Sequence, residues 1–194
     1  MRRALLLAAA LAAFGFASAG RAAAHPLGNF SINHLAVVSI DRDAVNVRWI
    51  LDQAEIPTFQ ERGLAPAVVL ARKRAVASAG LALTVDGRRV PLRAVGPGRI
   101  GFPPGQGGLK LTRVELRFRA AVHAIGHRVA LHDATFPGRI GWRDIIVRPG
   151  GGTAVRSSVP ATEPTLGLRR YPRDLLSSPA HQRDARFVVG VEGH

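Results

Sequence analysis

The sequence contains no cysteine and, among its 194 residues, one methionine and one tyrosine. Without cysteine no disulfide can form, so the fold depends on packing alone even if the protein is exported. A chain of this length is large enough for that, because a domain of about 150 residues buries roughly 70% of its extended surface. The natural expectation is one domain.

Long uncharged runs are missing after the first residues, since the most apolar later stretch, residues 66–83, contains Arg72, Lys73 and Arg74. The beginning of the chain differs. Arg2 and Arg3 precede an uncharged apolar run over residues 4–20, and three alanines occupy residues 22–24. This order is typical of an export signal. We expect residues 1–24 to be a signal peptide, His25 to be the mature N-terminus, and the protein to lie in the periplasm or at the outer face of the cell membrane. The alternative is a segment kept as a membrane anchor.

Lysine is also rare, because only Lys73 and Lys110 occur, so arginine supplies almost all of the net charge of +14. Such a charge is common in proteins that bind nucleic acid. The export signal and the scattered basic residues argue against that class, and we expect no nucleic-acid partner. A positively charged surface close to anionic membrane lipids is the simpler interpretation.

The remaining pattern predicts a mostly β, sandwich-like domain over residues 25–194, with one helix at about residues 64–79 and a loop-rich part over residues 149–194. Asp86-Gly87 is a two-residue hairpin turn, and residues 96–108 form a Gly/Pro loop. The expected strands are residues 30–40, 44–51, 81–85, 90–95, 109–122, 127–134 and 140–147, with short ones at 153–159 and 186–191.

His25 is the first candidate metal ligand. Cleavage after Ala24 would give it a free α-amine, which together with the ring Nδ1 can chelate one metal ion. Imidazole suits nickel, copper, cobalt and zinc. Pro26 has no N–H, which excludes the amide-nitrogen ligation used at some N-terminal copper sites. The alternative is that cleavage leaves a histidine there without a metal role.

The other candidate metal-binding or catalytic residues give weaker signals. His34 lies on an apolar strand face, where a hydrogen-bonded core histidine is commoner than a ligand. Asp52, Glu55 and Glu61 form an acidic cluster that can hold a cation or pair with arginine, and we expect the pairing. His132 and Asp133 could form a hydrolytic triad with Ser157 or Ser177, but the sequence has no GxSxG, HExxH or phosphate-loop motif. We therefore expect no enzyme.

Several short sequence segments, called phrases below, indicate a family more specifically than the composition does. They are His-Pro-Leu-Gly-Asn-Phe-Ser-Ile-Asn-His at residues 25–34, Asp-Gln-Ala-Glu-Ile-Pro-Thr-Phe-Gln-Glu at 52–61, Leu-Thr-Val-Asp-Gly at 83–87, Phe-Pro-Pro-Gly-Gln at 102–106, Gly-Arg-Ile-Gly-Trp-Arg-Asp at 138–144 and Tyr-Pro-Arg-Asp-Leu-Leu-Ser-Ser-Pro at 171–179. In this order they resemble the exported N-terminal domain of bacterial nickel/cobalt transporters of the NicO type.

The resemblance implies an extracytoplasmic accessory domain of a nickel/cobalt transport system. In that family the exported domain precedes a bundle of membrane helices, whereas this sequence ends at His194, where that bundle would begin. We expect either a separate subunit that docks on a membrane nickel/cobalt permease or a truncated transporter. His25 is the first candidate for binding Ni²⁺ or Co²⁺, and His34, Asp52 and Glu55 lie within the matching phrases. The alternative function is a metal-free structural interaction domain that docks on a membrane partner.

Overall fold

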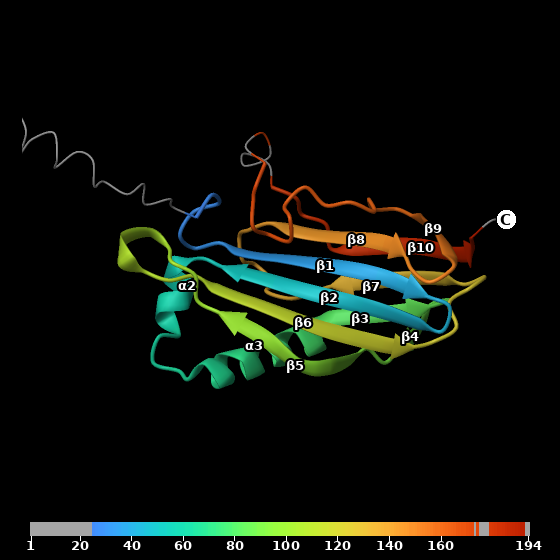
Figure 1. The fold of residues 1–194 in the computed structure, drawn as a ribbon, viewed down its shortest axis with the longest axis horizontal. Coiled ribbons are helices and arrows are strands. Elements are labelled where there is room, and N and C mark those ends of the chain that lie inside the picture. The colour runs from blue at the N-terminus through green and yellow to red at the C-terminus, as the bar shows by residue number, and fades with distance from the viewer. Residues whose placement is uncertain (1–24, 173, 175–178, 193–194) are drawn as a thin grey trace, which may run out of the picture.

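The computed structural model describes residues 25–172, 174 and 179–192, so the predicted signal peptide at residues 1–24 lies outside the described residues. The described chain folds into two five-stranded sheets that pack face to face (Figure 1). The first sheet has the order β5 (Arg93–Gly101), β6 (Thr112–Ala121), β2 (Ala44–Gln53), β1 (Ile32–Asp41) and β8 (Arg143–Pro149). The second has the order β4 (Arg88–Val90), β3 (Leu81–Val85), β7 (Arg128–Asp133), β10 (Asp184–Val191) and β9 (Thr153–Ser157). The mostly β, sandwich-like prediction is confirmed.

The main core lies between the two sheets. Its strands bury alternate residues, because successive side chains of a strand point to opposite faces. In β6 the inward residues Val114, Leu116 and Phe118 are at most 1% exposed. They pack with residues of the second sheet such as Leu83 and Phe187. This apolar layer stabilises a chain that has no cysteine and therefore no disulfide.

Strand β1 is buried on both faces. Ala36 and Val38 face the main core, whereas Leu35 and Val37 pack on the outer side against Trp142 and other residues of a second apolar cluster. That cluster includes Leu168 and Tyr171 of the connector between β9 and β10, residues 158–183. The described part of the connector therefore covers the outer face of the first sheet over β1 and β8.

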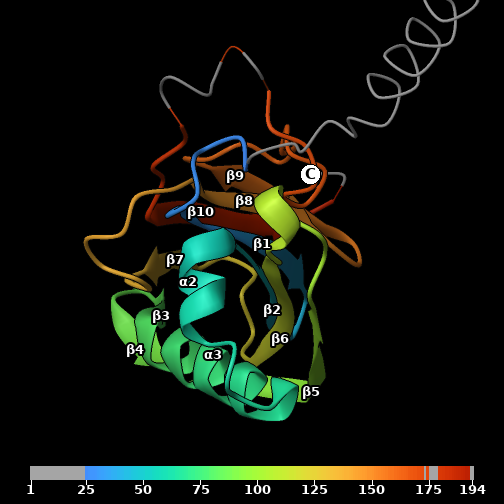
Figure 2. The same ribbon diagram turned by 90° about the vertical axis from the view of Figure 1, so that its left-hand side faces the viewer.

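Helix α3 (Pro66–Gly80) lies along one open edge of the sandwich, beside β5 and β3 (Figure 2). It begins with a proline at its first turn, where a missing N–H costs nothing. Its buried residues Val69, Lys73 and Ala77 are four apart and so share one face. A short helix α2 (Glu55–Gln60) follows β2, and a 3₁₀ turn covers Gln106–Gly108. Within the described part of the chain, no helix is both long and apolar enough to cross a membrane.

The predicted strand over residues 90–95 and loop over residues 96–108 are partly wrong. The chain leaves the second sheet after β4 and enters the first sheet as β5, an edge strand that contains Pro97. Proline is tolerated on an edge because its missing N–H faces no partner strand. A bulge between Val95 and Arg99 accommodates the Gly-Pro-Gly sequence. The helix predicted at about residues 64–79 and the Asp86-Gly87 hairpin are confirmed.

Gly141 packs closely against the start of β1. Its φ is +144°, and a Cβ there would lie 2.3 Å from the carbonyl oxygen of Ile32 and 2.8 Å from Asn33 Oδ1. We expect Gly141→Ala to lower the free energy of unfolding by about 2–4 kcal/mol, measured by urea denaturation. Gly138, with φ +72° and no neighbour within 4 Å, is the matched control. Its change to alanine should cost about 1 kcal/mol. Equal losses would show that the close approach to β1 does not matter.

Candidate functional site

His25 is held in a polar site on the outer face of the first sheet. Although it precedes β1, it is only 4% exposed. Its Nε2 lies 2.9 Å from Asp52 Oδ2 on β2, and its Nδ1 lies 3.0 Å from Ser31 Oγ. A turn in which the Gly28 N–H donates to the His25 carbonyl folds the segment back on itself. The imidazole is therefore fixed by both ring nitrogens.

The contacts of Asn33 and Leu27 frame the His25 ring. Asn33 Oδ1 accepts a hydrogen bond of 2.8 Å from the Trp142 N–H, so its Nδ2 points toward His25 and lies 3.1 Å from the ring Nε2. The same amino group donates to the Asp52 carbonyl at 3.1 Å and to Ser31 Oγ at 3.3 Å. The Leu27 N–H donates to His25 Nδ1 at 3.4 Å, so Nδ1 presents a lone pair. Nε2 is then the ring nitrogen that carries the hydrogen toward Asp52 Oδ2.

Tyr171 completes the site from the connector. Its hydroxyl donates to Asp52 Oδ2 at 2.7 Å, and its ring meets the His25 ring edge-on with 5.5 Å between centroids. Burial, together with the charge of Asp52, raises the pKa of Tyr171 well above its ordinary value. The phenol therefore stays protonated and remains a donor. Asp52 thus accepts from two side chains that lie far apart in the sequence.

A cleft of about 430 Å³ borders this site. Pro103, Pro104 and Leu111 form an apolar wall, and Arg113, Arg169 and Arg170 give it a basic rim. The Arg113 guanidinium donates to the carbonyls of Gly167 and Leu168, which ties the connector to β6. Burial lowers the pKa of Arg113 even though Asp52 lies close by. The cleft is thus open to solvent and positively charged beside His25.

His34 occupies a separate cluster, because it follows Asn33 on β1 and so points to the opposite face. Its Nδ1 lies 2.9 Å from Asp133 Oδ2, and the Thr135 hydroxyl and N–H donate to Asp133 Oδ1 at 2.6 and 2.8 Å. The rings of Trp49 and Phe136 lie 6.2 and 6.0 Å from the His34 ring, between centroids. Among the described residues, His34 Nε2 has no hydrogen-bond partner. His34 is thus the core histidine that its apolar strand face favoured.

The acidic cluster predicted from sequence is divided among three partners. Asp52 binds His25, whereas the fully buried Glu55 accepts from the Gln106 N–H at 2.9 Å through Oε1. Glu61 pairs at 2.8 Å with the buried ammonium of Lys73, which also donates to Gln53. Charge pairing is therefore found at Glu61, with a lysine in place of the expected arginine. The four candidate metal ligands do not converge: His25 and Asp52 meet, while His34 and Glu55 each lie elsewhere.

Over residues 25–172, 174 and 179–192, no three or more His, Cys, Asp or Glu side chains are grouped so as to hold a metal ion. The other paired histidines lie at the surface, each bonded to one aspartate: His123 with Asp43, His127 with Asp86 and His132 with Asp184. His132 and Asp133 point to opposite faces of β7 and form no pair. Ser177, one serine considered for a triad, lies outside the described residues.

Sequence reasoning missed Tyr171 and Asn33, and it paired Asp133 with His132 and not with His34, its partner in the structure. Tyr171 is the single tyrosine of the chain and lies in one of the recognised phrases, but its contact with Asp52 spans 119 positions. Asn33 could have been found, since strand alternation places it on the face opposite His34.

Comparison with known protein families, curated proteins and solved structures finds no match for this chain.

The Asp133–His34 pair predicts a pH dependence of stability. Burial alone would raise the pKa of Asp133, but hydrogen bonds from His34 and Thr135 outweigh it and hold the pKa below its ordinary value. The ionised form therefore stabilises the fold above the unfolded pKa of about 3.9, and this contribution is lost as pH falls through the folded pKa. We expect Asp133→Asn to lower the free energy of unfolding at pH 7 by about 1–3 kcal/mol. The difference in free energy of unfolding between the wild type and Asp133→Asn should shrink as the pH is lowered. Urea denaturation at a series of pH values measures it.

Asp184→Asn is the control for this prediction, because Asp184 makes the same kind of contact with His132 at the surface, where its side chain is 55% exposed. Its change should alter stability by less than about 1 kcal/mol. If the wild type and Asp133→Asn lose stability in parallel as pH falls, Asp133 is not the group responsible.

Proposed function

We propose that this chain is an extracytoplasmic, non-enzymatic accessory domain of a nickel/cobalt transport system, and that it binds the divalent ion through the mature N-terminal His25. The observation that carries the proposal is the fixed orientation of that imidazole. Its Nε2 is held by Asp52 at 2.9 Å, while Nδ1 accepts from the Leu27 N–H at 3.4 Å and lies 3.0 Å from Ser31 Oγ. The likeness of residues 25–34 to the NicO-type exported domain gives the choice of metal.

The chemistry of the site supports a ligand role for His25 and a different role for Asp52. A histidine that binds a metal through one nitrogen commonly donates its other N–H to a carboxylate, which fixes the ring and raises its basicity. Asp52 is placed to do this, and Tyr171 and Asn33 hold it there. After cleavage, the α-amine and Nδ1 of His25 would chelate the ion. Ser31 Oγ, 3.0 Å from Nδ1, would either turn away or add an oxygen ligand.

A specific observation favours the second candidate, a metal-free domain that docks on a membrane partner. Both ring nitrogens of His25 already have polar partners within the protein. In this second candidate, His25 anchors the N-terminal segment to the sheet and binds no metal. Phe30 and Ile140 are 58% and 64% exposed. Their segments meet where the Ile32 N–H donates to the Ile140 carbonyl. Exposed apolar side chains of this kind suit a docking surface.

Calorimetric titration of nickel and cobalt into protein purified after export and processing, with His25 as its first residue, tests the proposal. We expect binding in the micromolar range or tighter. One extra alanine before His25 converts the α-amine to an amide and should abolish binding. Asp52→Asn should weaken binding by about 10- to 100-fold while leaving the chelating atoms in place, because it removes the carboxylate behind the ring.

Tyr171→Phe is the graded variant, since it removes one hydrogen bond to Asp52 and keeps the ring. It should weaken binding less than Asp52→Asn does. Equal affinity with and without the extra alanine would move the metal to another site. No heat with either protein would reject the metal role and favour the docking domain, whose stability should then be unaffected by chelators.

A further inference from the structure

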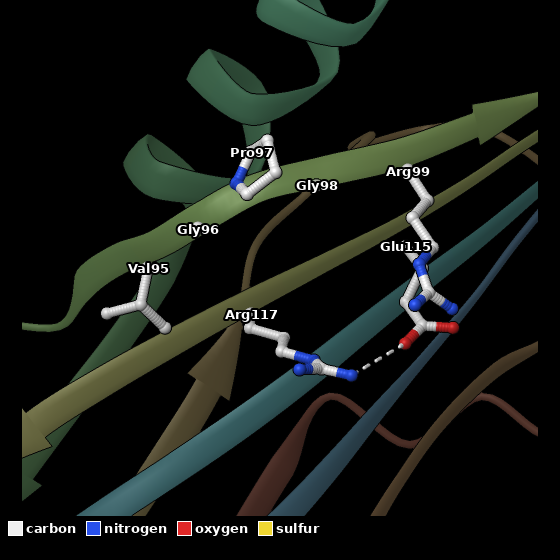
Figure 3. A pocket seen from close by; sticks show the side chains of 7 residues that line it. All are labelled: Val95, Gly96, Pro97, Gly98, Arg99, Glu115 and Arg117. Carbon is white, nitrogen blue, oxygen red and sulfur yellow. Dashed lines mark ion pairs between the residues drawn. The ribbon is translucent and has the colours of Figure 1, made fainter.

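The outer face of the first sheet is open on the side away from the connector, and this part carries a dense set of arginines. We call it the arginine face. It consists of Arg48 of β2, Arg93 and Arg99 of β5, and Arg117 and Arg119 of β6. All are exposed except Arg48, which is half-buried at the margin of the face beside Gly167 of the connector. Figure 3 shows the part of this face around Val95 and Arg99 of β5 and Arg117 of β6.

The strand register sets like charges directly opposite one another. Arg93 is paired with Arg119 across β5 and β6, and Arg48 is paired with Arg117 across β2 and β6. Like charges at such positions destabilise a sheet, since side chains in directly opposite pairs are only about 5 Å apart. Glu115 is the acid within this set and lies 4.0 Å from Arg117. Asp41 lies at the margin of the face, where Asn46 donates to it and accepts from Arg119. Two carboxylates cannot compensate five guanidinium groups, so the face carries a net positive charge.

We propose that the arginine face binds the anionic phosphates of a lipid bilayer. Guanidinium groups bind phosphate oxygens in a bidentate manner, and an open sheet face can present several of them to a bilayer surface at once. A protein partner is less suited, because the hot spots of protein interfaces combine arginine with buried aromatic anchors, and among the described residues this face has no exposed aromatic residue. Val95, 42% exposed, is the exposed large apolar residue here. The face also lacks the aromatic residues on which nucleic-acid bases stack. The choice of a bilayer over nucleic acid rests as well on the extracytoplasmic placement in the proposed function.

Vesicle co-sedimentation tests this inference with the exported and processed protein, whose N-terminus is checked by mass spectrometry. The vesicles are pure phosphatidylcholine, or phosphatidylcholine with phosphatidylglycerol at a ratio of about three to one. We expect binding only to the anionic vesicles and release as salt rises, because the interaction is screened. The combined change Arg93→Gln, Arg117→Gln and Arg119→Gln should weaken partitioning by at least about tenfold. Its thermal midpoint should not fall, since a like-charge pair is removed.

The matched control changes Arg128, Arg156 and Arg186 to glutamine. These three residues are exposed on the second sheet, so net charge falls equally. We expect this variant to bind anionic vesicles nearly as the wild type does. Equal loss in both variants, equal binding to neutral vesicles, or tighter binding to duplex DNA than to anionic vesicles would each overturn the inference. Nickel titration of the Arg93/Arg117/Arg119 variant reports separately on His25, so the two proposals can fail independently.

Discussion

The hydrogen bond between His25 Nε2 and Asp52 Oδ2 connects three distant parts of this chain. It seats the segment before β1 on β2, and Tyr171 binds the same carboxylate from the connector. The connector then covers the outer side of β1, so that this strand is buried on both faces. A carboxylate buried at this depth needs donors on its lone pairs, and the site supplies them from both ends of the described chain. Its geometry therefore depends on the whole fold.

Strand alternation on β1 places the two histidines of residues 25–34, His25 and His34, in different sites. Asn33 faces outward to the His25 site, and His34 faces inward to Asp133 between the sheets. The outward site borders an open, basic cleft, whereas the inward one is enclosed by Trp49 and Phe136. The outward site is therefore the one for which we propose a ligand. The inward pair serves stability, and its contribution varies with pH.

Much of the fold could be predicted from the sequence, because it is set by local rules. The alternation of Val114, Leu116 and Phe118 fixed the inward face of β6, and Asp86-Gly87 fixed one hairpin. The change of sheet between β4 and β5 could not be predicted, since Gly-Pro-Gly is typical of a loop until an edge and a bulge accept it. The site was predicted in part. Chemistry singled out His25, but the Tyr171 contact and the separation of His34 and Glu55 from it depend on tertiary packing.

Nuclear magnetic resonance of the imidazole nitrogens tests the central claim most directly. In the processed protein, labelled with ¹⁵N, we expect the His25 ring to carry its proton on Nε2 and to be hydrogen-bonded. Substoichiometric Co²⁺ should broaden the His25 signals before those of the surface residues His123, His127 and His132. A proton on Nδ1 would contradict the orientation set by Asp52. Broadening of the surface histidines with His25 untouched would contradict its role as the metal ligand.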